Sequence, residues 1–173
     1  QYGRPRKKGG INCGNEGAGV VVAAGTSLRA QELLGKVVAV FGSGGCYSQY
    51  KLASAVGRSI NVMPNGIDPI QASSSYVNPL TALGLLSTVA LEGHKAVIST
   101  AAASQLGQMM VRICMNDDKM PSLINIVRRE KQRELLLSIN PKAIVLNSSD
   151  RNFESKLLVA VVSYNVTAAL DAT

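Results

Sequence analysis

Residues 96–107 read AVISTAAASQLG, a short apolar run that passes through small residues into a helical pattern. Ala96 to Thr100 has the length and aliphatic content of a buried strand. The following residues repeat apolar side chains at the spacing of one helical face: Leu106, Met109, Met110, Ile113 and Cys114. A strand, a turn and a helix in this order predict the first half of a βαβ unit.

The same alternation continues to the end of the chain. It predicts further strands at 123–127, 143–146 and 168–170, a helix around 135–139, and a helix over 153–161 that starts at Ser149 or Asp150. Four strands that alternate with helices predict a doubly wound parallel sheet. Ahead of the first strand, Asn78 is expected to cap a helix with Pro79 in its first turn.

The chain has a different character before residue 76. Short apolar runs bounded by glycines predict β-strands at 19–25 and 36–41, and the stretch 60–66 predicts another strand that ends in a turn. The sequence therefore predicts a mostly β domain over residues 1–75 and an α/β domain over residues 76–173.

Composition agrees with this α/β class. Of 173 residues, 46% are hydrophobic but only 4% are aromatic, so the core must be aliphatic. Such a core suits parallel strands that are covered on both faces. The three cysteines are odd in number and far apart, which indicates neither a disulfide framework nor a zinc knuckle. We expect a reducing intracellular compartment, either mitochondrial or cytoplasmic. No apolar run reaches the length of a membrane span.

The net charge of +7 includes a basic arm formed by Arg4, Arg6, Lys7 and Lys8. Such an arm could bind phosphate backbones or anionic partners. Because no aromatic interleaving or nucleic-acid motif accompanies it, we interpret it as a solvated terminus and expect no nucleic-acid partner.

The turn after the first α/β strand is the segment that can bind a phosphate. Dinucleotide loops place small residues at G-x-G-x-x-G spacing, for a tight turn, for approach of the pyrophosphate and for close packing of the helix. Here those positions are Ala102, Ser104 and Gly107. The Ser104 hydroxyl could donate to a phosphate oxygen, and the helix N-terminus favours an anion. Taken alone the pattern is weak, because an ordinary βα turn would look similar.

The next strand strengthens this interpretation. NAD-binding folds usually end it in an acidic residue that binds the ribose 2′-hydroxyl. Here it ends in Arg128 and Arg129, and guanidinium groups suit a 2′-phosphate. The alternative is that both arginines only solvate the strand end, with Glu130 paired to one of them. Combined with the loop, the pattern predicts NADPH as cofactor.

These motifs together resemble the medium-chain dehydrogenase/reductase superfamily, on its zinc-free side of quinone oxidoreductases and 2-enoyl thioester reductases. The resemblance rests on residues 14–21, 44–50, 77–82, 101–107, 126–129 and 169–172. It implies a partial GroES-like catalytic domain followed by a partial Rossmann domain. It also implies a cofactor site made of Asn78 and Thr81 near the nicotinamide, Ala102, Ser104, Gln105, Leu106 and Gly107 on the pyrophosphate, and Arg128 and Arg129 on the 2′-phosphate.

The departures from the family concern the metal and the proton donor. The zinc enzymes of the superfamily have a metal-binding histidine where this chain has Asn15, and the only histidine, His94, precedes a strand of the other domain. We therefore expect no metal, a surface position for His94 and cysteines that act as small apolar packers. The reductases use a tyrosine as proton donor, but Tyr2 precedes the matching region, so no catalytic residue is assigned.

The implied activity is hydride delivery from NADPH to an activated double bond or a quinone, without metal, on a small-molecule substrate. The alternative is a non-catalytic structural or interaction subunit, derived from such an enzyme and retained in a larger assembly. As protein partners we expect a homo-oligomer or a larger protein assembly. The chain has roughly half the family's length. We therefore expect either a fragment truncated at both ends or a partner that covers an exposed strand edge near residue 168.

Overall fold

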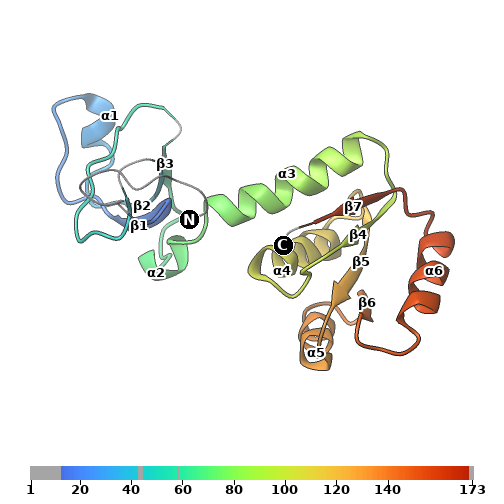
Figure 1. Cartoon of the computed structure of the whole chain (residues 1–173). Helices are drawn as coiled ribbons and strands as arrows, with labels where there is room; N and C mark the ends of the chain where they lie inside the picture. The colour runs from blue at the N-terminus through green and yellow to red at the C-terminus, as the bar shows by residue number, and fades with distance from the viewer. Residues whose placement is uncertain (1–12, 43–44, 58, 172–173) are drawn as a thin grey trace, which may run out of the picture. The chain divides into compact units, whose positions relative to one another are not determined.

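The computed structural model describes residues 13–42, 45–57 and 59–171. These residues fall into two compact units that divide between Val77 and Asn78 (Figure 1). The division lies two residues after the boundary expected from the sequence. The basic arm over residues 1–8 falls outside the described residues. Within the described part of the chain, no helix is both long and apolar enough to cross a bilayer.

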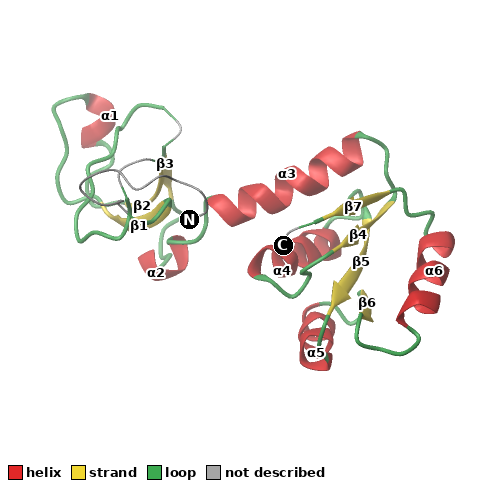
Figure 2. Cartoon of the chain, viewed as in Figure 1, coloured by secondary structure: helices red, strands yellow, loops and turns green. Residues whose placement is uncertain are grey.

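The first unit contains a small antiparallel sheet in the order β1-β2-β3 (Figure 2). Its elements are β1 (Glu16–Val20), α1 (Leu28–Gln31), β2 (Val37–Phe41), β3 (Ile60–Val62) and α2 (Pro69–Ala72). The expected strand over 19–25 was wrong in its extent. The chain leaves the sheet after Val21, which exchanges backbone hydrogen bonds with Gly35 and Lys36, and it enters α1, whose cap is Ser27. The unit is therefore less β-rich than the sequence predicts.

The long helix α3 (Val77–Leu91) begins one residue before the expected cap. Asn78 is its second residue and Pro79 its third, where a missing N–H costs no helical hydrogen bond. The start is fixed instead by Glu16, whose Oε2 accepts from the backbone N–H groups of Tyr76 (3.0 Å) and Val77 (2.7 Å). The prediction that Asn78 is the cap was wrong because this carboxylate comes from a strand remote in sequence.

The second unit is the parallel α/β structure that the sequence predicts. Its sheet has the order β6-β5-β4-β7, and every neighbouring pair is parallel. The strands are β4 (Ala96–Ser99), β5 (Ser122–Val127), β6 (Ile144–Asn147) and β7 (Ala168–Leu170), and the helices after α3 are α4 (Gln105–Asn116), α5 (Glu130–Ile139) and α6 (Phe153–Ser163). Helices α4, α5 and α6 each connect two strands (Figure 2). The α/β fold class is confirmed.

Aliphatic side chains form the core of this unit, with Leu86, Val97, Met110 and Leu136 fully buried. Two buried polar side chains interrupt it. Among the described residues, Ser99 Oγ and Asn125 Oδ1 are buried without a hydrogen-bond partner, but Asn125 Nδ2 donates to the carbonyl oxygens of Leu123 (3.2 Å) and Ile144 (3.1 Å). The Asn125 amide therefore joins β5 to β6 inside the core.

Helix α6 starts later than predicted. Phe153 is its first residue and Asn152 its cap, instead of Ser149 or Asp150. Asp150 forms a turn before the helix, since its Oδ1 accepts from Asn152 N (3.1 Å) and its carbonyl accepts from Phe153 N (3.0 Å). The short polar side chain thus stabilises a turn and not the helix end.

Candidate functional site

The loop between β4 and α4 is tightly closed. Ala101 adopts a positive φ of 47°, an uncommon conformation for a residue with a Cβ. Ser104 N donates to the Ala101 carbonyl (2.8 Å), and Ser104 Oγ accepts from Gly107 N (3.2 Å) as the cap of α4. The loop therefore enters α4 through a sharp turn, as a phosphate-binding loop must.

Gly107 lies against the backbone of this turn. A Cβ built on Gly107 would lie 2.5 Å from the carbonyl carbon of Ala102 and 2.7 Å from its Cα, and nearer still to its oxygen. Ala102 itself is fully buried, so it cannot move aside freely. The close approach expected at the third small position is present, and it requires glycine.

The first turn of α4 offers donors to an anion. Gly107 N is used by the Ser104 side chain, whereas the N–H groups of Gln105 and Leu106 have no partner among the described residues. Ser104 and Gln105 are exposed. Because the Ser104 oxygen accepts from Gly107, its hydroxyl hydrogen remains available as a third donor. These groups fit a pyrophosphate at a helix N-terminus.

Two arginines, Arg128 and Arg129, follow strand β5 directly and lie at the same end of the sheet as the β4–α4 loop. Ala102 N donates to the carbonyl of Ile126 (3.4 Å), two residues before Arg128. Arg128 and Arg129 are both exposed, and their guanidinium groups have no side-chain partner in the part of the chain that the structure describes. The suggested pairing with Glu130 is not found, because Glu130 Oε1 binds Arg133 Nη1 at 2.8 Å.

The structure thus places Ala102, Ser104, Gln105, Leu106 and Gly107 beside the strand that leads to the two arginines. Asn78 and Thr81 lie on the first two turns of α3, one helical turn apart and so on one face. Their position near a nicotinamide stays a prediction.

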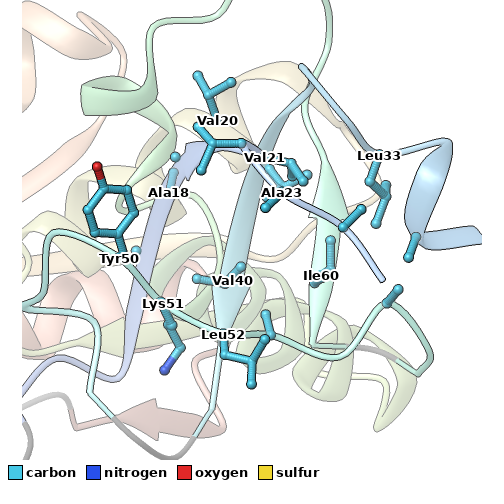
Figure 3. A pocket seen from close by; sticks show the side chains of 18 of the residues that line it. Ala18, Val20, Val21, Ala23, Leu33, Val40, Tyr50, Lys51, Leu52 and Ile60 are labelled. Carbon is cyan, nitrogen blue, oxygen red and sulfur yellow. The ribbon is translucent and has the colours of Figure 1, made fainter. Parts of the chain in front are cut away.

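A second candidate is a cavity of about 430 Å³ within the first unit (Figure 3). Val20, Val21, Val40, Leu52 and Ile60 are among the residues that line it. Its one charged lining residue in the described chain is Lys51, whose Nζ donates to the Gly45 carbonyl at 2.9 Å. Most of the lining is apolar, and Tyr50 and Lys51 bring polar groups to it (Figure 3).

Of the titratable side chains in the described residues, two have clearly shifted pKa values, and neither lies in the loop. Burial, with a smaller effect of Asp117, raises the pKa of the Cys114 thiol to about 11. Hydrogen bonds from Lys156 and from Asn152 N lower the pKa of the exposed Asp150 carboxyl. His94 is partly exposed, and its Nδ1 lies 2.6 Å from Thr167 Oγ1. Within the described ranges, no three His, Cys, Asp or Glu side chains gather as a metal-ligand set.

Sequence reasoning missed the residues that support the two arginines. Gln132 accepts from the backbone of Arg128 and Arg129, and Ser149 donates to Arg128. A glutamine at the third position of a helix often accepts from the residue before that helix, which was the available signal.

Several solved structures that are similar to this chain are named as quinone reductases or quinone oxidoreductases. The chain is 33% identical to a candidate NADPH:quinone reductase from Mesorhizobium loti, with a TM-score of 0.82 over 100% of this chain and 49% of that one. It is 26% identical to a second such protein from Bacillus thuringiensis, with a TM-score of 0.67 over 87% of this chain and 44% of that one. The quinone oxidoreductase of Escherichia coli, solved with NADPH, is 21% identical and has a TM-score of 0.66 over 94% and 48%.

The chain therefore spans about half the length of the solved proteins that it matches. A scan against protein-family models and a search of curated proteins found no match.

Proposed function

This chain has the fold of the medium-chain dehydrogenase/reductase superfamily and resembles its quinone oxidoreductases and enoyl reductases, and from that premise we propose that it binds NADPH for a metal-independent reduction. The observation that carries the proposal is the pair of exposed arginines, Arg128 and Arg129, without carboxylate partners among the described residues, beside the loop closed on Gly107. Arginine forms bidentate hydrogen bonds with phosphates, and so favours NADPH over NADH.

When bound, NADPH supplies the hydride, and the acceptor is an activated double bond or a quinone of small-molecule size. The chain's own residues then have binding and orienting roles. The N–H groups of Gln105 and Leu106 and the hydroxyl of Ser104 hold the pyrophosphate. Arg128 and Arg129 neutralise the 2′-phosphate. Asn78 and Thr81 lie near the nicotinamide ring. The compartment and the oligomeric state stay predictions, because they rest on cysteine usage and on the resemblance.

The test is a comparison of NADPH and NADH binding by isothermal titration. Wild type should prefer NADPH, and Arg128→Gln or Arg129→Gln should each reduce that preference roughly 10- to 100-fold, since one charge-assisted hydrogen bond contributes roughly 1.5–3 kcal/mol. Arg112→Gln is the matched control, because Arg112 is exposed on α4 beyond its first turn. An unchanged preference in both arginine variants would remove the 2′-phosphate assignment.

A second assay separates an enzyme from a non-catalytic subunit. NADPH oxidation, followed by the loss of the cofactor's near-ultraviolet absorbance, is measured with a benzoquinone and with an enoyl thioester. Turnover with either acceptor supports the reductase. Tight NADPH binding without turnover on any acceptor would favour the alternative of an interaction subunit in a larger assembly.

A further inference from the structure

The turn that presents the two arginines is fixed at every backbone polar group. Gln132 Oε1 accepts from Arg128 N (3.0 Å) and from Arg129 N (3.1 Å). Ser149 Oγ donates to the Arg128 carbonyl at 2.9 Å, and the Arg129 carbonyl accepts from the N–H groups of Gln132 and Arg133. The backbone of Arg128 and Arg129 therefore has no free donor for a ligand, and only the guanidinium groups remain for one.

The charge of the side chain at position 132 matters in this arrangement. Gln132 is neutral, whereas a glutamate of the same length could accept the same two hydrogen bonds and would add a negative charge next to both arginines. The nearby carboxylate of Glu130 is already engaged, by Arg133 at 2.8 Å and more weakly by Asn147 Nδ2 at 3.5 Å. The turn is thus hydrogen-bonded at the backbone of both arginines and carries a positive charge without a carboxylate partner in the described structure.

We propose that Gln132 is a positioning residue that determines the preference for a 2′-phosphorylated nucleotide. Ser149, in the β6–α6 connection, contributes a second hydrogen bond to the same turn. The inference rests on the proposed function, because it assigns Arg128 and Arg129 to the 2′-phosphate. Gln132 acts by directing the two guanidinium groups outward and by keeping negative charge away from the ligand. Ser149 acts by fixing the carbonyl of Arg128.

The experiment uses the whole chain and two probes that differ only in the 2′-phosphate, adenosine 2′,5′-bisphosphate and adenosine 5′-monophosphate. Gln132→Glu should lower the affinity ratio of the two probes about tenfold, as expected for one added charge several ångströms from a phosphate at a hydrated surface. Ser149→Ala should lower it about threefold, the effect of one lost neutral hydrogen bond. Lys142→Gln is the control, since it makes the same charge change in the exposed turn before β6 and should leave the ratio unchanged.

Amide hydrogen exchange gives a readout that needs no nucleotide. In the Gln132→Leu variant, the amide hydrogens of Arg128 and Arg129 should exchange with solvent faster than in wild type. Equal exchange rates would overturn the positioning role. A wild type that prefers the bisphosphate while Gln132→Glu keeps that preference would overturn this inference and leave the proposed function intact. A wild type without any preference would overturn the proposed function, and this inference with it.

Discussion

Replacing Gly107 with alanine tests the geometry of the loop directly. The new Cβ would lie 2.5 Å from the Ala102 carbonyl carbon, whereas non-bonded carbon atoms prefer about 3.5–4.0 Å. The first turn of α4 or the buried loop must therefore shift by about 1 Å. The obstacle is backbone, so no side-chain rotation can relieve it.

Two effects of opposite sign decide the magnitude. Alanine in place of glycine stabilises a helix by at most about 1 kcal/mol. Forcing extra volume into a packed site costs about 1–3 kcal/mol, and the upper end applies here because the neighbour is buried backbone. We expect Gly107→Ala to be destabilising by about 2 kcal/mol, which lowers Tm by roughly 10 °C for a unit of this size.

Urea and thermal unfolding, followed by circular dichroism, provide the assay. Gly84→Ala is the matched control, because Gly84 is exposed in α3 and a Cβ there would meet nothing within 4 Å. This control should gain stability by up to about 1 kcal/mol. If Gly107→Ala were as stable as wild type, the close approach of α4 to Ala102 would be refuted. NADPH affinity should fall in Gly107→Ala and stay unchanged in Gly84→Ala.

Three further predictions concern other parts of the chain. Glu16→Ala should cost about 1 kcal/mol in urea unfolding because two N–H groups at the start of α3 lose their acceptor, while Glu16→Gln, which keeps an acceptor, should lose less. Iodoacetamide at about pH 8 should modify the exposed Cys13 well before Cys114, whose raised pKa leaves very little thiolate; mass spectrometry of early time points that found Cys114 labelled first would contradict this. Because the pKa of Asp150 is lowered in the folded state, its carboxylate stabilises the protein at pH values above its ordinary pKa, and this stabilisation is lost as the pH falls through the lowered pKa. The stability advantage of wild type over Asp150→Asn in unfolding experiments should therefore shrink below about pH 4 and not grow.

The sequence predicted the parallel sheet because its signals are local. The aliphatic run Ala96 to Ile98 and the helical face that contains Met110 can each be recognised within about a dozen residues of sequence. The start of α3 was missed because its cap, Glu16, lies 61 residues before Val77. No sequence signal could have shown the positive φ of Ala101, since the turn is imposed by the strand and the helix on either side.

For the candidate site, the sequence predicted which residues take part but not how their side chains pair. Spacing identified the loop and the close approach at Gly107, and charge identified Arg128 and Arg129, although their roles in binding stay predictions. What spacing could not give was the environment of the arginines. Whether Glu130 pairs with Arg129 or with Arg133 depends on side-chain geometry around one helical turn, and only the structure distinguishes the two.

The buried amide of Asn125 has a consequence for how the sheet assembles. Because Asn125 Nδ2 donates to the Ile144 carbonyl, a slip of β6 by one residue would break that bond and leave the amide with only its hydrogen bond to the Leu123 carbonyl, at a cost of about 0.5–1.5 kcal/mol. The same slip would displace the chain after β6 by about 3.3 Å, beyond hydrogen-bond reach of Ser149 for Arg128. The buried Asn125 amide thus favours the observed pairing of β5 with β6, and through it the position of Ser149 beside Arg128.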